Sequence, residues 1–192
     1  MPLTTAQRYT LRNQINADPA LSAWPNNDDG HYEIVKAFAL PSGVDVWRTE
    51  APVQDIINAI DWSKYTPTDS ATESDTPALA VAKTNRLLAV QTKQMNLQLM
   101  LQGRETLDCS KPSIRTGLRD CVVQVPTGTG GAMTQPGGAN AVTVLNACIR
   151  KANRGESLYA TVPAQTGGTT AFLLTFEGLV SLEDVREARN LP

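Results

Sequence analysis

The stretch TPALAVAKTNRLLAVQTKQMNLQLMLQG (76–103) decides the fold, because it predicts the longest regular element of the chain. Thr76-Pro77 is a typical helix-opening pair, and Gly103 is a natural C-cap. Between them apolar residues recur at helical spacing, and no proline interrupts the pattern. We therefore expect one long helix that runs to about Gln102.

A row of glutamines follows this predicted helix, and apolar residues lie on both sides of it. The row consists of Gln91, Gln94, Gln98 and Gln102, flanked by Leu87, Val90, Leu97 and Leu101 on one side and by Leu88, Met95 and Leu99 on the other. An amide that is buried without a partner is costly, so the row favours a facing helix that supplies matching groups. The same pattern also fits glutamines at the rim of a contact within one chain. The first interpretation places Gln91, Gln94, Gln98, Gln102, Leu97 and Leu101 at a subunit interface.

Shorter elements are expected on the N-terminal side of this helix. Thr4 with Gln7 forms a capping box for a first helix, and Asp28 or Asp29 can cap a second one. Pro52 suits the first turn of a third helix. Residues 63–76 are polar and rich in Ser, Thr and acidic residues, which indicates a mobile loop.

The C-terminal side predicts helices first and strands afterwards. A fifth helix begins near Pro112, and the glycine-rich segment 126–139 separates it from a sixth helix that Asn140 caps and that ends before Gly155. Strands are expected at 157–162 and 170–178, joined by a TGG turn, followed by a short helix at 182–190.

The predicted fold class is α+β and predominantly α-helical. It has a helical bundle core, a small C-terminal β-hairpin and long flexible loops. We expect a single structural domain, residues 1–192, with extended arms that are mobile at about 63–76 and 126–139.

Composition and charge exclude several classes of protein. With 41% apolar and 19% charged residues the chain has an ordinary globular composition, and its net charge of -2 does not favour tight binding to nucleic acid. No apolar run is long enough for a membrane span, and the polar N-terminus lacks the apolar core of a signal peptide. The expected location is the cytoplasm, unless a larger particle carries the protein out.

Residues suited to catalysis or metal binding are scarce. The single histidine, His31, and three cysteines without a CxxC pair cannot build the usual zinc sites. The TGTGG segment (127–131) lacks the Gly-Lys-Ser/Thr ending of a phosphate loop, and no GxSxG motif is present. We expect no enzyme, no metal and no cofactor; the alternative is a hydrolase with an undetected thiol or carboxylate site.

Four basic residues form a modest patch around the predicted fifth helix. Arg115 and Arg119 lie one turn apart on its expected polar face, and Arg104 and Lys111 flank the connection before it. The patch could contact phosphate groups of DNA, which leaves a small DNA-associated regulatory module as an alternative function; the other interpretation is a solvated face.

Several segments together resemble small proteins that tailed bacteriophages encode near their head and tail genes. These segments are Asp18-Pro19-Ala20-Leu21, VWRTEAPVQDIINAIDW (46–62), KQMNLQLMLQGR (93–104), SKPSIRTGLRDC (110–121) and TFEGLVSLEDVREAR (175–189). The chain resembles the head–tail connector family, whose members are also called adaptor or neck proteins. Another tail or capsid-associated component is the alternative within the same resemblance.

The resemblance implies a virion structural protein at the head–tail junction, present in the host cytoplasm before assembly. Copies would form a homo-oligomeric ring, a dodecamer if the protein is a portal adaptor, around the channel through which DNA leaves. The implied partners are the portal protein, the next tail or neck protein and, at most transiently, DNA. No membrane contact is implied.

Overall fold

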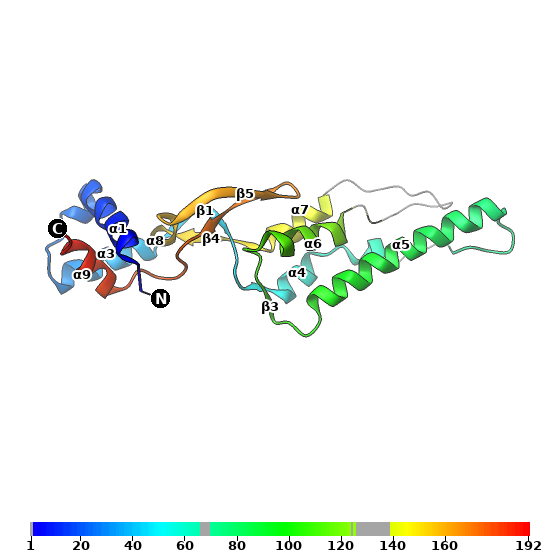
Figure 1. The fold of residues 1–192 in the computed structure, drawn as a ribbon, viewed down its shortest axis with the longest axis horizontal. Helices are drawn as coiled ribbons and strands as arrows, with labels where there is room; N and C mark the ends of the chain where they lie inside the picture. The colour runs from blue at the N-terminus through cyan, green and yellow to red at the C-terminus, as the bar shows by residue number, and fades with distance from the viewer. Residues whose placement is uncertain (1, 66–69, 124, 126–138) are drawn as a thin grey trace. The chain divides into compact units, whose positions relative to one another are not determined.

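The computed structural model describes residues 2–65, 70–123, 125 and 139–192. Over these residues the chain has an α+β fold in which helices predominate, as predicted (Figure 1). The helices are α1 (Thr5–Ala17), α2 (Pro19–Ser22), α3 (Asp28–Ala39), α4 (Val53–Ala59), the 3-10 helix η1 (Trp62–Tyr65), α5 (Pro77–Leu101), α6 (Pro112–Val122), α7 (Ala139–Asn146), α8 (Arg154–Ser157) and α9 (Leu182–Arg189). The strands are β1 (Pro41–Trp47), β2 (Ala51–Pro52), β3 (Thr106–Leu107), β4 (Ile149–Asn153), β5 (Ala160–Thr166) and β6 (Thr169–Leu174).

The chain divides into two compact units. Unit 1 comprises Met1–Val46, Arg150–Ala164 and Ala171–Pro192, and unit 2 comprises Trp47–Ile149 and Gln165–Thr170. The expectation of a single domain with extended arms stays a prediction.

In unit 1 the terminal helices pack together. The predicted capping box of Thr4 and Gln7 opens α1, and α9 packs against both α1 and α3. The apolar side chains between these helices form one core: Leu3, Leu11, Ile15, Leu21, Ile34, Phe38, Tyr159, Phe176, Val180, Val185 and Ala188. The cap of α3 is Asn27, whose side chain accepts a hydrogen bond from the backbone N–H of Gly30, rather than Asp28 or Asp29.

The predicted hairpin is present, but it belongs to a larger sheet. β5 and β6 are neighbours, and Gly167 and Gly168 between them have φ values of 56° and 92°, which a two-residue turn favours. β1 pairs with β6 in parallel, with Val46 opposite Phe172. With β4 at the other edge the strand order is β4-β1-β6-β5.

The prediction of a sixth helix from Asn140 to Gly155 is wrong over its second half. The helix, α7, ends at Asn146, and residues 149–153 form the edge strand β4. Sheet hydrogen bonds outweigh the helical pattern of this segment. Asn153 then caps the short helix α8 in a capping box with Glu156, a sequence signal that the predicted helix had hidden.

In unit 2 the long helix α5 packs on α6, α6 packs on α7, and α4 packs on α7 (Figure 1). β2 and β3 form a short antiparallel pair in which Ala51 lies opposite Leu107. The apolar side chains buried in this unit include Val53, Ile56, Val90, Leu97, Leu118, Val144 and Leu145.

The segments predicted to be mobile are described only in part. Residues 63–65 belong to η1, and the Asp75 carboxylate forms an ion pair of 2.9 Å with Lys83. Residues 66–69 and 126–138, which make up most of the predicted arms, lie outside the described residues.

Candidate interaction surface

The inner face of α5 holds the helix to unit 2. The Thr76 side chain caps its first turn, and Arg86, Val90, Leu97 and Leu101 are buried. Leu97 and Leu101 were expected at a subunit interface; they face the interior of their own chain instead. The amide row therefore marks the border between the buried and the exposed side of the helix.

The outer face of α5 is apolar although it lies in solvent. Val81, Leu88, Met95 and Leu99 each have between 55% and 65% of their surface exposed. Gln91, Gln98 and Gln102 are exposed beside them, and Gln94 is half-buried. We call the exposed stripe of Val81, Asn85, Leu88, Thr92, Met95, Leu99 and Gln102, with Gln91 and Gln98 at its margin, the outer face of α5.

The structure describes all of α5, and no charged residue of this helix lies on its outer face. The charged residues of the helix are Lys83, Arg86 and Lys93. Lys83 pairs with Asp75, the Lys93 ammonium donates to the carbonyl of Asp120, and Arg86 is buried. A solvated helix normally carries charges on its exposed side, whereas the centres of protein interfaces are depleted of them.

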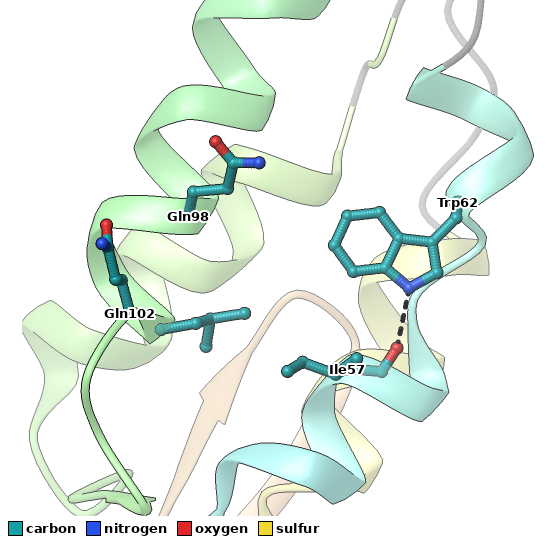
Figure 2. A pocket seen from close by; sticks show the side chains of 5 residues that line it. Ile57, Trp62, Gln98 and Gln102 are labelled. Atoms are coloured by element: carbon teal, nitrogen blue, oxygen red, sulfur yellow. Dashed lines mark hydrogen bonds between the residues drawn. The ribbon is translucent and has the colours of Figure 1, made fainter.

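A pocket of about 440 Å³ opens beside the C-terminal half of α5. Its lining is Ile57, Trp62, Gln98, Leu101 and Gln102. Figure 2 shows Gln98 and Gln102 on one side, and Trp62 and Ile57 together on the other. The Trp62 indole N–H donates to the Ile57 carbonyl at 3.0 Å, which holds the ring in place. We call this cavity the Trp62 pocket.

The sequence does not predict the Trp62 pocket. Its polar composition predicts a loop at 63–76, and no pattern places Trp62 near the long helix. Trp62 follows α4 closely, and its ring packs at 5.8 Å from that of the buried Tyr65. An aromatic pair just after an apolar helix was the available signal.

A second hollow, of about 460 Å³, opens on the other side of α5. Residues of α5 and α6 line it, namely Lys93, Asn96, Leu99, Met100, Gly117, Asp120 and Cys121. The C-terminal half of the outer face therefore lies between two recesses, while the N-terminal half projects Val81, Leu87 and Leu88.

Of the four basic residues in the predicted patch, Arg115 is not on the surface. It is 2% exposed, so it does not lie on the polar face of α6. Its guanidinium donates to the carbonyls of Cys109 and Ser110, at 2.8 and 2.6 Å, and to the Thr166 hydroxyl at 3.2 Å. It also lies 4.7 Å from the centre of the Trp47 ring. These bonds make it a structural residue of the interior.

Of the other three basic residues, Arg104 and Lys111 are exposed and Arg119 is half-buried, and two of the three have acidic partners. Lys111 pairs with Asp108, and Arg119 pairs with Asp120. Arg104 is exposed in the turn after α5. With Arg115 in the interior and these pairs in place, the three residues present little unbalanced positive charge.

The three cysteines of unit 2 are buried thiols. The Arg48 backbone lies between Cys109 and Cys148, because its N–H donates to the Cys148 carbonyl and its carbonyl accepts from the Cys109 N–H, both at 2.9 Å. A hydrogen bond between the thiols lowers the pKa of Cys109 and raises that of Cys148, and burial raises the pKa of Cys121. Neither Cys109 nor Cys148 reaches solvent, so the lowered pKa of Cys109 creates no accessible nucleophile.

His31 lies in unit 1, where its Nε2 is 2.7 Å from the Asn26 side-chain oxygen. Burial, together with Arg189, lowers its pKa. Within the described part of the chain no three His, Cys, Asp or Glu side chains gather as they would around a metal ion. No helix of that part is both long and apolar enough to cross a membrane.

Comparison with known proteins adds no relative: no family model, no curated protein and no solved structure matches the chain.

Proposed function

We propose that the chain is a structural protein of a tailed-phage virion that works by contact with copies of itself and with other virion proteins. In its most specific form the protein forms an oligomeric ring that joins the portal to the tail around the DNA channel. The observation that carries the proposal is the charge-free, apolar outer face of α5. Such a face, at the length of a 25-residue helix, favours burial in an assembly over permanent exposure.

The arrangement of charges also supports a protein that surrounds DNA without holding it. The net charge is -2, and Lys111 and Arg119 have acidic neighbours. Tight phosphate binding requires several unbalanced basic groups, and it would oppose the sliding of DNA through a channel. The alternative of a DNA-associated regulator loses one of the two arginines on which it rests, because the Arg115 guanidinium donates to backbone carbonyls.

The test is binding to a purified portal ring of the phage or prophage that carries the gene. We expect the wild-type protein to co-sediment with the ring and to add a layer of density in electron micrographs. A protein that leaves the ring bare, and binds instead to another tail or capsid assembly, would contradict the connector role and favour that alternative.

Binding to duplex DNA separates the regulator from the structural protein. We expect no binding at moderate salt, and only weak, salt-sensitive binding at low salt. Tight binding that is lost in a double Lys111→Ala and Arg119→Ala variant would support the regulator instead.

A further inference from the structure

The outer face of α5 has the spacing of a two-helix seam. Its residues follow one another alternately by four and three positions: Val81, Asn85, Leu88, Thr92, Met95, Leu99 and Gln102. This alternation lines one stripe of a helix and is the pattern by which two helices pack knobs into holes. The positions on the opposite side, Val90 and Leu97, are those that the helix buries in its own unit.

The absence of charge identifies the class of partner. A basic partner such as a nucleic-acid-binding surface, or an acidic one such as nucleic acid itself, would find no opposite charge along this stripe. The complementary surface has to be apolar in its centre and uncharged at its margins, with amides that can pair with amides. Within α5, which the structure describes completely, the outer face itself has this composition, so a second copy of the chain satisfies the requirement.

The register of such a pair follows from the sequence of the stripe. When two copies of α5 run antiparallel with Leu88 opposite Leu99, Thr92 falls opposite Met95 and Asn85 falls opposite Gln102. Leucine then meets leucine and amide meets amide in layers related by a two-fold axis. Gln91 of one copy lies beside Gln98 of the other at the margin of the seam.

The direction of the pair follows from the recesses on either side of α5. Antiparallel packing lays the N-terminal half of one helix, which projects Leu87, over the C-terminal half of the other, which the Trp62 pocket borders. In this register Leu87 is level with Met100 of the other copy, and its neighbours on the same side of the seam are Gln98, Leu101 and Gln102, which line the Trp62 pocket. Parallel packing would place Leu87 opposite the N-terminal half, away from the pocket.

We propose that two copies of the chain pair antiparallel through the outer faces of α5, with Leu88 of each copy opposite Leu99 of the other and Leu87 entering the other copy's Trp62 pocket. This pairing rests on the proposed function, because it names a second copy of the chain as a partner for the outer face of α5. A two-fold contact closes at two copies, so the contacts that build a ring lie on other surfaces.

The first experiment measures the oligomeric state of the full-length protein by analytical ultracentrifugation. We expect the wild type to form dimers and a Leu88→Glu, Leu99→Glu variant to be monomeric. Each of the two leucine layers would then hold two opposed carboxylates, whose repulsion and burial raise the dissociation constant at least about tenfold. Both side chains are exposed in the single chain, so circular dichroism should show an unchanged fold.

Leu179→Glu is the matched control, because Leu179 has the same 65% exposure as Leu99 but lies in unit 1. This variant should remain a dimer. A wild-type monomer, or a dimer that persists in the Leu88→Glu, Leu99→Glu variant, overturns the proposal.

The second experiment tests the direction. Leu88→Cys protein mixed with Leu99→Cys protein should form a disulfide-linked heterodimer on mild oxidation, detectable by intact mass, while Leu88→Cys alone should not link. Native cysteines do not interfere because all three are buried. Linking of Leu88→Cys to itself would show parallel helices and overturn the antiparallel register.

Failure here and failure of the proposed function can be told apart. If the protein dimerises through α5 but binds no portal ring, the α5 pairing is correct and the connector role is wrong. If the protein is monomeric but binds the ring, the α5 pairing is wrong and the connector role is correct.

Discussion

The two units bury charges of opposite sign. Among the described residues, the buried charged side chains of unit 1 are the carboxylates of Glu156 and Asp184, and those of unit 2 are the guanidiniums of Arg86 and Arg115. A buried charge has to be hydrogen-bonded, and its sign decides which backbone groups it satisfies. Unit 1 therefore gathers backbone N–H groups around acids, and unit 2 gathers carbonyls around a base.

In unit 1 the two carboxylates join segments that are distant in sequence. Glu156 accepts from the N–H groups of Asn153 and Gly178, at 3.0 and 2.9 Å, and receives two hydrogen bonds from Arg150. Asp184 accepts from the N–H of Leu3 at 2.9 Å, and caps α9 together with Ser181. Acid thus neutralises the buried charges of unit 1, whereas the buried arginines of unit 2 keep their charge in acid.

Removing the guanidinium of Arg115 should have the largest effect on stability, and this effect should fall on unit 2. Arg115→Ala leaves two buried carbonyls without their donor and opens a space beside Trp47, so we expect a loss of about 3–5 kcal/mol of unfolding free energy in unit 2. Denaturant unfolding followed by tryptophan fluorescence would measure it in a Trp24→Phe, Trp62→Phe background, where Trp47 is the remaining tryptophan. Arg119→Ala is the control, because that side chain is only half-buried, and it should change stability by less than about 0.5 kcal/mol.

Neutralising Glu156 should have the next largest effect and should act on the other unit. Glu156→Gln keeps the size of the side chain but leaves Arg150 without its main counter-charge, which should cost about 2–3 kcal/mol. Hydrogen exchange should rise in α8 and in residues 176–180 while α5 and α6 stay protected. Equal loss in the exposed control Glu183→Gln would show that the buried position has no special role.

The two units should differ in their stability to acid. Burial alone would raise the pKa of Glu156 and of Asp184, but hydrogen bonds from Arg150 and backbone N–H groups to Glu156, and from Ser181 and the Leu3 N–H to Asp184, outweigh it and lower both values. Unfolded carboxyls titrate near about pH 4, so the stabilisation is complete above that pH and is lost as the pH falls through the folded pKa values. Hydrogen exchange should therefore show unit 1 opening before unit 2. Simultaneous opening would contradict the contrast.

His31 should add the smallest effect, at a higher pH. Burial lowers its pKa, and Arg189 and Arg186 act in the same direction, so between that value and about 6.5 the unfolded chain binds the extra proton. Unit 1 should lose some stability as the pH falls below about 6.5. The melting temperature of a His31→Gln variant should depend less on pH in this window than that of the wild type.

Local signals in the sequence predicted many of the helices. Thr4, Thr76 and Ser181 cap their helices as expected, because a capping box or a Thr-Pro pair acts within one turn. Ile149–Asn153 was assigned wrongly because its partner strand is far away in sequence, so only the tertiary fold decides between helix and strand.

The sequence predicted where the candidate surface lies on the chain, but not which side of the long helix it occupies. The pattern of α5 located the amide row but could not tell which flank the chain itself would cover, since Leu97 and Leu99 are equally apolar. Arg115 was read as a surface residue because an isolated arginine on a helix usually is one. Its burial depends on Trp47 and Thr166, which a spacing rule within α6 does not include.

The division of the chain has a consequence for its synthesis. The backbone passes between the units at residues 46–47, 149–150, 164–165 and 170–171, so neither unit is a continuous segment. On the ribosome, α1 and α3 emerge first, yet they have to wait for α9 before their shared core can close. Unit 2 can collect most of its residues earlier, with only the tip of the β5–β6 hairpin still missing. A nascent chain should therefore acquire protease resistance around α5 and α6 before it does so at its own first helix.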